Sequence, residues 1–543
     1  MEKSFIISGN IVDVVRGVIF KGTVTVENGI IASVTESGCV DGQYILPGFV
    51  DAHVHVESSM LVPTEFARLA VVHGTVASVS DPHEIANVLG LDGVKFMIEN
   101  SRKTPFRFCF GAPSCVPATP FETSGATLGL AEVEELLKMQ EIGYLAEMMN
   151  FPGVLSGNAE VLAKLDLAKR FGKPVDGHAP GLKGEDATCY IGAGITTDHE
   201  CYTLDEATEK IGYGMHVLIR EGSAARNFDT LLPLLKHHPG KVMFCSDDKH
   251  PDDLVEGHIN LLVKRAIKSG YNAMDVIRAC TLNPVKHYNL ACGLLRPGDS
   301  ADFIVADNLH DLHIHSAFIR GEKVAENGVS LLPHLVACTP NCFHAGLITP
   351  ESLQIPATGS TVNVIGACDG DLVTGQLQAQ VLNENGLAVT DPSRDLLKIA
   401  VINRYTSSAP ALGFIMGIGL KNGAIASTVA HDSHNIICAG TNDQDMTRAI
   451  NLLIEHKGGI AAVNGGEAEI LPLPVAGLMS ECDGYEVARK YQQINRMVKS
   501  LGSPLHAPFM TLSFMALLVI PSLKMSDKGL FDGNGFRFRE LFV

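Results

Sequence analysis

The feature that most constrains the fold is an alternation of short apolar stretches and helical patterns between about residues 45 and 290. Each apolar stretch ends in polar or small residues, and a helical segment follows it. Strands that alternate with helices of this length form parallel βαβ units. We expect eight strands, at Ile45–Val50, Thr75–Val79, Phe106–Phe110, Tyr144–Met149, Pro174–Asp176, Ile195–Thr197, His216–Ile219 and Val242–Cys245.

Eight such units within residues 46–290 fit a (β/α)8 barrel, so we predict an α/β fold with a TIM-like barrel. A doubly wound open sheet is the alternative. Such a sheet usually carries a glycine-rich phosphate loop after its first strand, and neither GxGxxG nor GxxxxGK[ST] occurs in the chain. The barrel is therefore the preferred prediction.

The segments that flank the barrel have a different pattern. Residues 1–45 contain short strand-like pieces divided by glycines, and a similar pattern returns in residues 291–345. Because each segment is too short to bury a core of its own, we expect both to pair into one small β-sandwich domain. Residues 346–543 are glycine-rich and mixed in pattern, which predicts a C-terminal α/β domain.

Charge and cysteine content limit the expected partners and location. The 42 basic and 60 acidic residues leave a net charge of −18, which argues against a nucleic acid or an anionic membrane as partner. The longest apolar run, Phe509 to Ile520, is shorter than the roughly 20 residues of a membrane-spanning helix. Thirteen cysteines without paired spacing, and no recognisable export signal, favour reduced thiols in the cytoplasm.

The most informative motif is LPGFVDAHVH, an apolar strand at residues 46–55 that ends in His-x-His. Residues i and i+2 of a strand point to the same face, so His53 and His55 both face the barrel axis at its C-terminal mouth. Barrels of this kind keep their active sites at that mouth, and two adjacent imidazoles there make half of a metal site. Two surface histidines at a strand end are the alternative interpretation.

The ends of four further predicted strands add one possible ligand each. These residues are Glu147, His178, His199 and Asp247. Any one of them is more often a polar residue that ends a strand, but six groups in the same register are hard to explain in that way. Four imidazoles and two carboxylates can hold two divalent ions that are bridged by a carboxylate and a hydroxide.

This set resembles the amidohydrolase superfamily. Its pattern is His-x-His after strand 1, a bridging group on strand 4, histidines on strands 5 and 6, and an aspartate on strand 8. Most members with two metals bridge them with a carboxylated lysine. The fourth strand here, GYLAEMMNF, has no lysine, so the resemblance implies Glu147 as the bridge.

A closer resemblance, to the bacterial adenine deaminase family, covers nearly the whole chain. It is carried by HVHVESSM (53–60), SDPHEIANVLG (80–90), EMMNFPGV (147–154), GHAPG (177–181), TTDHE (196–200), AHDSHNI (430–436) and LPLPVAGLMS (471–480). The resemblance implies hydrolysis of a small purine, adenine, to hypoxanthine and ammonia in purine salvage. It implies two metal ions, manganese first and iron next, although zinc suits the same ligands. We also expect a homo-oligomer.

For the reaction we hypothesise that a metal-bridged hydroxide attacks position 6 of the purine, with Asp247 as metal ligand and general base. The ring nitrogen then needs an acid. Glu57 is the first candidate, because it lies two residues past His55 and shares its face if the strand stays extended. His83, after the second strand, is the other candidate. A solvated loop carboxylate and a hydrogen-bonded loop histidine are the alternative interpretations.

The C-terminal region carries AHDSHN at residues 430–435, directly after the apolar stretch Ala424–Val429. A small planar base needs burial on most sides, and a barrel mouth is open on one side. We therefore predict that the C-terminal domain folds over the mouth and brings His431 or His434 to the substrate pocket. A polar turn that binds nothing is the alternative.

Two other functions are compatible with the same barrel. An amidohydrolase that cleaves a cyclic amide or an N-acetyl group would use the same metals and base, and a fold does not fix a substrate. A non-catalytic scaffold is disfavoured, because all six expected ligands are present. The Pro-Cys-x-x-Cys motif of zinc-dependent nucleobase deaminases and the HExxH motif of metalloproteases do not occur.

Overall fold

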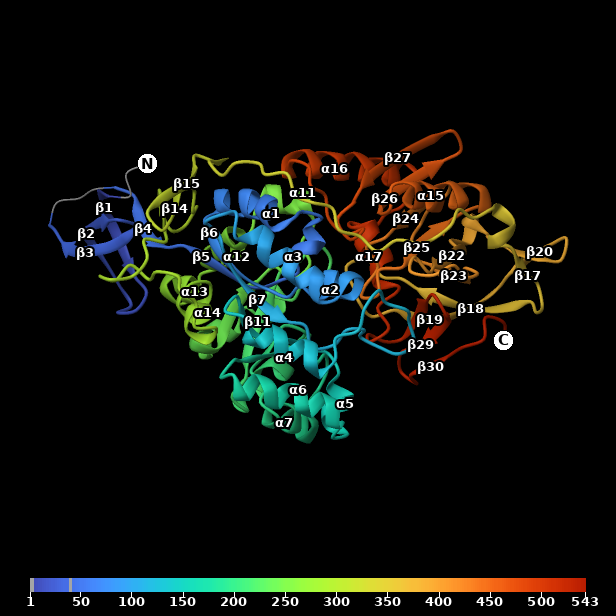
Figure 1. Cartoon of the computed structure of the whole chain (residues 1–543), viewed down its shortest axis with the longest axis horizontal. Helices are drawn as coiled ribbons and strands as arrows, with labels where there is room; N and C mark the ends of the chain where they lie inside the picture. The colour runs from blue at the N-terminus through green and yellow to red at the C-terminus, as the bar shows by residue number, and fades with distance from the viewer. Residues whose placement is uncertain (1–3, 39–41) are drawn as a thin grey trace.

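Parallel strands at the centre of the molecule build the barrel in the computed structural model, which describes residues 4–38 and 42–543. The sheet built from both flanks lies at one end of the long axis, and the C-terminal region lies at the other (Figure 1). The predicted fold class, a TIM-like barrel with a small β domain and a C-terminal mixed α/β region, is confirmed. Residues 1–3 and 39–41 of the predicted first segment lie outside the described residues.

The barrel strands follow each other in chain order. They are β5 (Phe49–Val54), β6 (Thr75–Ser80), β7 (Arg107–Ala112), β8 (Ile142–Met148), β9 (Val175–Gly177), β10 (Thr197–Asp198), β11 (His216–Arg220) and β12 (Val242–Cys245). The first five form one parallel sheet and the last three another. A parallel bridge between Val54 and Asp247 joins the first strand to the segment after the last. Most of these strand residues are buried, as expected for a parallel sheet covered by helices.

Helices between the strands cover the outside of the barrel. The longer ones are α1 (Pro63–Ala70), α3 (Leu91–Ser101), α4 (Leu130–Lys138), α6 (Ala159–Arg170), α7 (Gly184–Gly192), α8 (Leu204–Gly212), α12 (Ile259–Lys268) and α13 (Ala273–Ala279). Several begin at a side chain that accepts hydrogen bonds from the first free N–H groups. Asn158 caps α6, Thr203 caps α8 and Asn272 caps α13.

The prediction of one strand over Ile45–Val50 is wrong, because the chain forms two strands there. β4 (Tyr44–Pro47) belongs to the flanking sheet, and β5 begins the barrel. Gly48 separates them, and a Cβ at this position would lie 2.4 Å from the Val76 side chain. The close approach of the second barrel strand therefore requires glycine at the point where the chain passes from one sheet to the other.

The two flanks of the barrel share one eight-stranded sheet with the order β16-β15-β14-β13-β4-β1-β2-β3. Its strands are β1 (Phe5–Asp13), β2 (Val18–Glu27), β3 (Ile30–Glu36), β4, β13 (Phe303–Ala306), β14 (Ile314–Ile319), β15 (Glu322–Glu326) and β16 (Val329–Ser330). The strand β4 joins the flanks, because it pairs in parallel with β1 and antiparallel with β13. The sheet buries an apolar cluster of its own, which includes Phe303 and Phe318.

The C-terminal region is centred on a second eight-stranded sheet with the order β19-β18-β23-β22-β25-β24-β26-β27. Its strands are β18 (Thr361–Gly366), β19 (Gly375–Gln380), β22 (Leu397–Ile402), β23 (Ala411–Met416), β24 (Ala424–Ser427), β25 (Ile436–Gly440), β26 (Gly459–Asn464) and β27 (Glu467–Pro472). The helix α15 (Asp443–Glu455) packs on β24, β25 and β26. Helices α16 (Gly484–Ser500) and α17 (Pro508–Phe514) lie between this sheet and the barrel (Figure 1).

Contacts between the C-terminal region and the barrel are direct. The Ser480 N–H donates to the Met60 carbonyl at 2.8 Å, and Arg68 Nη1 lies 2.7 Å from Asp483 Oδ2. One apolar cluster runs through both regions. The apolar run 509–520 belongs to this buried part, and no helix in residues 4–38 and 42–543 is long and apolar enough to cross a membrane.

Candidate metal centre and active site

The first half of the candidate metal centre lies where β5 and β12 end at the barrel mouth. The Asp247 N–H donates to the His53 carbonyl at 2.9 Å, which holds the two strand ends together. As expected for residues i and i+2, the His53 and His55 side chains converge, with 3.3 Å between their Nε2 atoms. Asp247 Oδ1 lies 3.7 Å from the first of these nitrogens and 3.3 Å from the second.

The second half comes from the ends of β9 and β10. Glu147, on β8, lies between the halves and presents one carboxylate oxygen to each. Its Oε1 lies 3.6 Å from His55 Nε2. Its Oε2 lies 2.9 Å from His178 Nδ1 and 3.2 Å from His199 Nε2. The structure therefore brings the side chains of all six predicted ligands together, with Glu147 between the two halves.

The donor set fits divalent cations. The Nε2 atoms of His53 and His55 converge with Asp247 Oδ1, and His178 Nε2 is buried without a hydrogen-bond partner within residues 4–38 and 42–543, so nitrogen and oxygen donors are available to a cation. Burial alone would raise the pKa of Glu147, but His178 and His199 outweigh it and hold the pKa well below its usual value. The Glu147 carboxylate is thus charged at neutral pH. Imidazole and carboxylate ligands suit manganese, iron and zinc alike, so the donor set does not identify the metal.

Arg220 and Glu200 form a buried charged pair beside Asp247 that the sequence analysis missed. Arg220 is the last residue of β11, and its guanidinium donates to both oxygens of Glu200 and, at 2.6 Å, to Asp247 Oδ2. One oxygen of Asp247 is thus held by Arg220, while the other faces the His53–His55 pair. Both missed residues stand at strand ends, which is the signal that identified the six predicted ligands.

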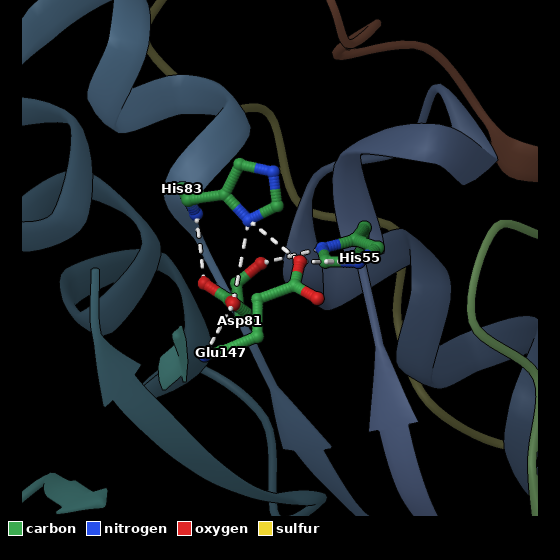
Figure 2. A group of neighbouring side chains, drawn as sticks. All are labelled: His55, Asp81, His83 and Glu147. Carbon is green, nitrogen blue, oxygen red and sulfur yellow. Dashed lines mark hydrogen bonds and ion pairs between the residues drawn. The ribbon is translucent and has the colours of Figure 1, made fainter. Parts of the chain in front are cut away.

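Asp81 is a further strand-end residue that the sequence analysis did not select. It follows β6, and its carbonyl lies 3.1 Å from His55 Nδ1. Its Oδ2 accepts from the Glu147 N–H at 3.3 Å and lies 3.3 Å from His83 Nδ1 (Figure 2). His83 begins the helix α2 (His83–Leu89), and its Nδ1 also lies 3.4 Å from Glu147 Oε1. Asp81 therefore orients two imidazoles and the bridging carboxylate.

Glu57, the predicted acid, is not among the described residues that line the pocket. This corrects the expectation that it faces the substrate. The expectation required an extended chain, but the 3-10 helix η1 (Val56–Ser59) begins directly after His55. Glu57 Oε1 instead accepts from the Ile85 N–H at 3.2 Å, in the first turn of α2. Glu57 therefore holds the helix that carries His83. Burial raises the pKa of Glu57 to about 7.

The C-terminal region contributes the loop between β24 and β25 to the pocket. His431 and Asp432 line the pocket, whereas His434 is not among the described residues that line it. The imidazoles of His431 and His434 each make a hydrogen bond to the Glu84 carboxylate on α2, one to each oxygen. The His431 ring stacks on Phe514 at the end of α17, with 5.2 Å between the ring centroids. The loop is therefore locked to the barrel helix that carries His83.

The complete pocket combines a polar floor from the barrel with a partly apolar roof from the C-terminal region. Its lining residues are His55, His83, Glu84, Glu147, Met149, His178, His199, Glu200, Arg220, Asp247, Asp248, Leu372, His431, Asp432, Phe514 and Leu517.

Comparison with known proteins identifies the family. The chain is 52% identical over 545 residues to the adenine deaminase of Salinibacter ruber, with 100% of each chain covered. It is 54% identical to the adenine deaminase of a Sulfurovum species, over 97% of this chain and 98% of the relative. The chain belongs to the adenine deaminase family. The family assignment predicted from the sequence is therefore confirmed.

Two family models match separate parts of the chain. The amidohydrolase family model matches residues 44–341, and the model of the adenine deaminase C-terminal domain matches residues 371–537. The chain is thus a hydrolase of the type that acts on C–N bonds. A solved D-hydantoinase from a Thermus species has a TM-score of 0.46 and 15% identity, over 60% of this chain and 96% of that one.

Proposed function

We propose that this chain hydrolyses adenine to hypoxanthine and ammonia in the pocket at the barrel mouth, in purine salvage. The observation that carries the proposal is the convergence of Glu147, Asp247 and four imidazoles beneath a roof that the C-terminal region supplies. Relatives that match over nearly their full length, at 52% and 54% identity, carry the name adenine deaminase. The substrate class that follows is a small purine.

We propose two divalent ions, manganese first, with iron or zinc as alternatives. His53, His55 and Asp247 would hold one ion, His178 and His199 the other, and Glu147 would bridge them. Bound there, the ions supply Lewis-acid activation of water at neutral pH.

Asp247 is suited to move protons between the water and the departing amine. Burial alone would raise its pKa, but Arg220 and the nearby histidines outweigh that effect and hold the pKa well below its usual value. Arg220 occupies Oδ2, so Oδ1 remains directed at the His53–His55 pair, where it can accept the water proton. The same oxygen can then donate that proton to the amine.

His83 is the better placed of the two candidate acids for the purine ring, because it lines the pocket and Glu57 does not. Burial alone would lower the pKa of His83, but the carboxylates of Asp81 and Glu84 outweigh it and raise the pKa well above its usual value. A protonated His83 can therefore donate to a ring nitrogen as that atom gains charge. His431 and Asp432 would contact the ring from the roof, and Phe514 would exclude water.

Ammonia release tests the function. The purified chain is depleted of metal, reloaded separately with Mn²⁺, Fe²⁺ or Zn²⁺, and assayed on adenine and on a panel of cyclic amides and N-acetyl compounds. We expect adenine turnover that needs metal and is highest with Mn²⁺. Amide hydrolysis without adenine turnover would overturn the proposal.

We also propose a cytoplasmic homo-oligomer that binds neither nucleic acid nor membranes. The net charge of −18 and free thiols at every cysteine within residues 4–38 and 42–543 support this proposal. Cell fractionation and light scattering of the purified chain test the location and the oligomeric state.

A further inference from the structure

A second cavity, of about 620 Å³, lies on the outer side of the wall that carries Arg220 and Asp248. Glu221 and Gly222, which follow Arg220, line this cavity, as does Lys249, which follows Asp248. Arg220 and Asp248 themselves line the catalytic pocket, and the two cavities have no lining residue in common. The end of β11 and the segments after β11 and β12 therefore contribute residues to both cavities.

Basic side chains gather around this second cavity in a chain whose net charge is −18. They are Arg226, Lys249, Lys264, Arg265 and Lys268. Two of them already have acidic partners, because Arg265 lies 2.7 Å from Glu221 Oε1 and Lys268 lies 3.0 Å from Asp311 Oδ1. The other three have no ion pair within the described part of the chain.

Lys249 is the most constrained of the three unpaired cations. The residue is only 6% exposed, and within residues 4–38 and 42–543 its ammonium makes no hydrogen bond and no ion pair, although the charge of Asp253 acts on it. A buried charge is costly unless it is paired, so an anion in the cavity would remove that cost. The carboxylates of Asp253 and Glu256 also line the cavity, and Asp253 already accepts a hydrogen bond from Ser223.

Arg226 is held in place for a similar role. Its Nε donates to the Gly222 carbonyl at 2.9 Å and its Nη2 donates to the Ser223 carbonyl at 3.1 Å. These bonds fix the guanidinium plane at the cavity wall and leave Nη1 without a partner among the residues that the structure describes. A fixed guanidinium and a buried ammonium are a donor set suited to the oxygens of a phosphate group.

We propose that this cavity binds the phosphate of a small phosphomonoester, with Lys249, Arg226 and Lys264 as its cationic contacts. The volume lies within the range of about 300–1,000 Å³ that small-molecule sites occupy and is larger than a phosphate ion needs. Leu262 and the partly exposed Leu261 offer an apolar surface to the rest of the ligand. A nucleoside monophosphate has this combination of a dianion and a planar, partly apolar body.

Calorimetric titration of the full-length, metal-loaded chain tests the proposal, with adenosine monophosphate, adenosine and inorganic phosphate as probes. We expect the monophosphate to bind and adenosine to bind at least about 10-fold more weakly, because the phosphate makes the charged contacts. Phosphate that binds as tightly as the monophosphate would identify free phosphate as the natural ligand of the same site. No heat with either anion would overturn the proposal.

Substitutions at each cavity show where the monophosphate binds. Lys249→Met should weaken monophosphate binding by about 10-fold or more, and Lys264→Met, on α12, should weaken it by several-fold without disturbing the buried wall. Lys268→Met is the matched control and should leave the affinity unchanged, because Lys268 is already paired with Asp311. His431→Ala removes a lining residue of the catalytic pocket and should also leave it unchanged. Loss of binding in His431→Ala, with full binding in both lysine variants, would contradict the proposal.

Discussion

The Glu147 carboxylate is the point at which the two halves of the candidate metal centre meet. Each of its oxygens faces a different pair of imidazoles, His55 and His83 on one side and His178 and His199 on the other. A group with two equivalent acceptors, placed at the end of the fourth strand, can bridge two cations without any covalent modification. In the proposed two-metal centre, Glu147 takes the place of a lysine on that strand.

Glu147→Gln should therefore reduce bound metal from two ions per chain to about one. An amide has only one acceptor oxygen and no charge, so it cannot bridge two cations. Elemental analysis of the purified variant, reloaded with excess Mn²⁺, measures the content. Glu185→Gln, at an exposed helix position, is the control and should keep both ions. Two retained ions in Glu147→Gln would show that Glu147 is not the bridge.

Asp247→Asn should lower adenine turnover more than it lowers metal content. The amide cannot accept the water proton, and loss of a general base typically costs about 10²–10⁴-fold in rate. His53, His55 and Glu147 remain to hold the ion nearest Asp247. Steady-state kinetics and elemental analysis on the same preparation separate the two effects. A near wild-type rate would remove Asp247 from the mechanism.

At the scale of elements, the segment after each barrel strand decides what the site contains. The rule that a polar residue ends an apolar strand selected His53, Glu147 and Asp247 as ligands, and the structure brings their side chains together. Asp81 and Arg220 also stand at the ends of barrel strands, so the same rule predicts them from the sequence.

Other elements could not be predicted from local patterns. Whether the chain stays extended after His55 depends on packing, and the structure turns it into a 3-10 helix that directs Glu57 to α2. Close backbone packing in the C-terminal region is another example. Gly417 and Gly423 lie against the backbone carbonyls of Ala367 and Val463. Such contacts join residues far apart in the chain, so spacing alone does not reveal them.

The loop between β24 and β25 supplies an element-scale prediction. The double variant His431→Ala with His434→Ala should raise the Michaelis constant or lower turnover by about 10- to 100-fold, because two charge-assisted hydrogen bonds to Glu84 and one substrate-facing ring are lost. Both metals should remain, since the ligands come from the barrel. His456→Ala, in the same region outside the pocket lining, is the control. Unchanged kinetics would mean that the loop only packs against the barrel.

At the scale of the whole molecule, the C-terminal region is held over the barrel mouth by a barrel loop at residues 119–128. The Thr123 N–H donates to Asp527 Oδ1 at 2.9 Å, and Asn435 Nδ2 donates to the Thr123 carbonyl at 2.9 Å. Closure of the pocket therefore depends on residues more than 300 positions apart in the chain, which explains why sequence patterns predict the domains but not how they lock together.

Glu122 makes this junction sensitive to pH. Its Oε1 accepts from Thr119 Oγ1 at 2.9 Å, whereas its Oε2 is buried without a partner within residues 4–38 and 42–543. Burial, and then the charge of Asp432, raise the pKa of Glu122 to about 8. The carboxyl therefore stays protonated in the folded protein at pH values at which the unfolded chain has lost that proton.

The sign of the effect follows from proton linkage. Between pH 4.5 and about 8 the folded state holds one more proton at Glu122 than the unfolded state does, so stability falls as the pH rises through this window. The loss of folding stability is about 1.4 kcal/mol for each pH unit.

Glu122→Gln mimics the protonated carboxyl and keeps the Thr119 bond, so the variant should unfold at the same temperature as wild type near pH 4.5. At pH 8 it should unfold several degrees higher. Thermal unfolding followed by circular dichroism at both pH values measures the difference, and Glu185→Gln should show no pH-dependent gain. An equal shift at both pH values would show that the carboxyl of Glu122 does not titrate in this window.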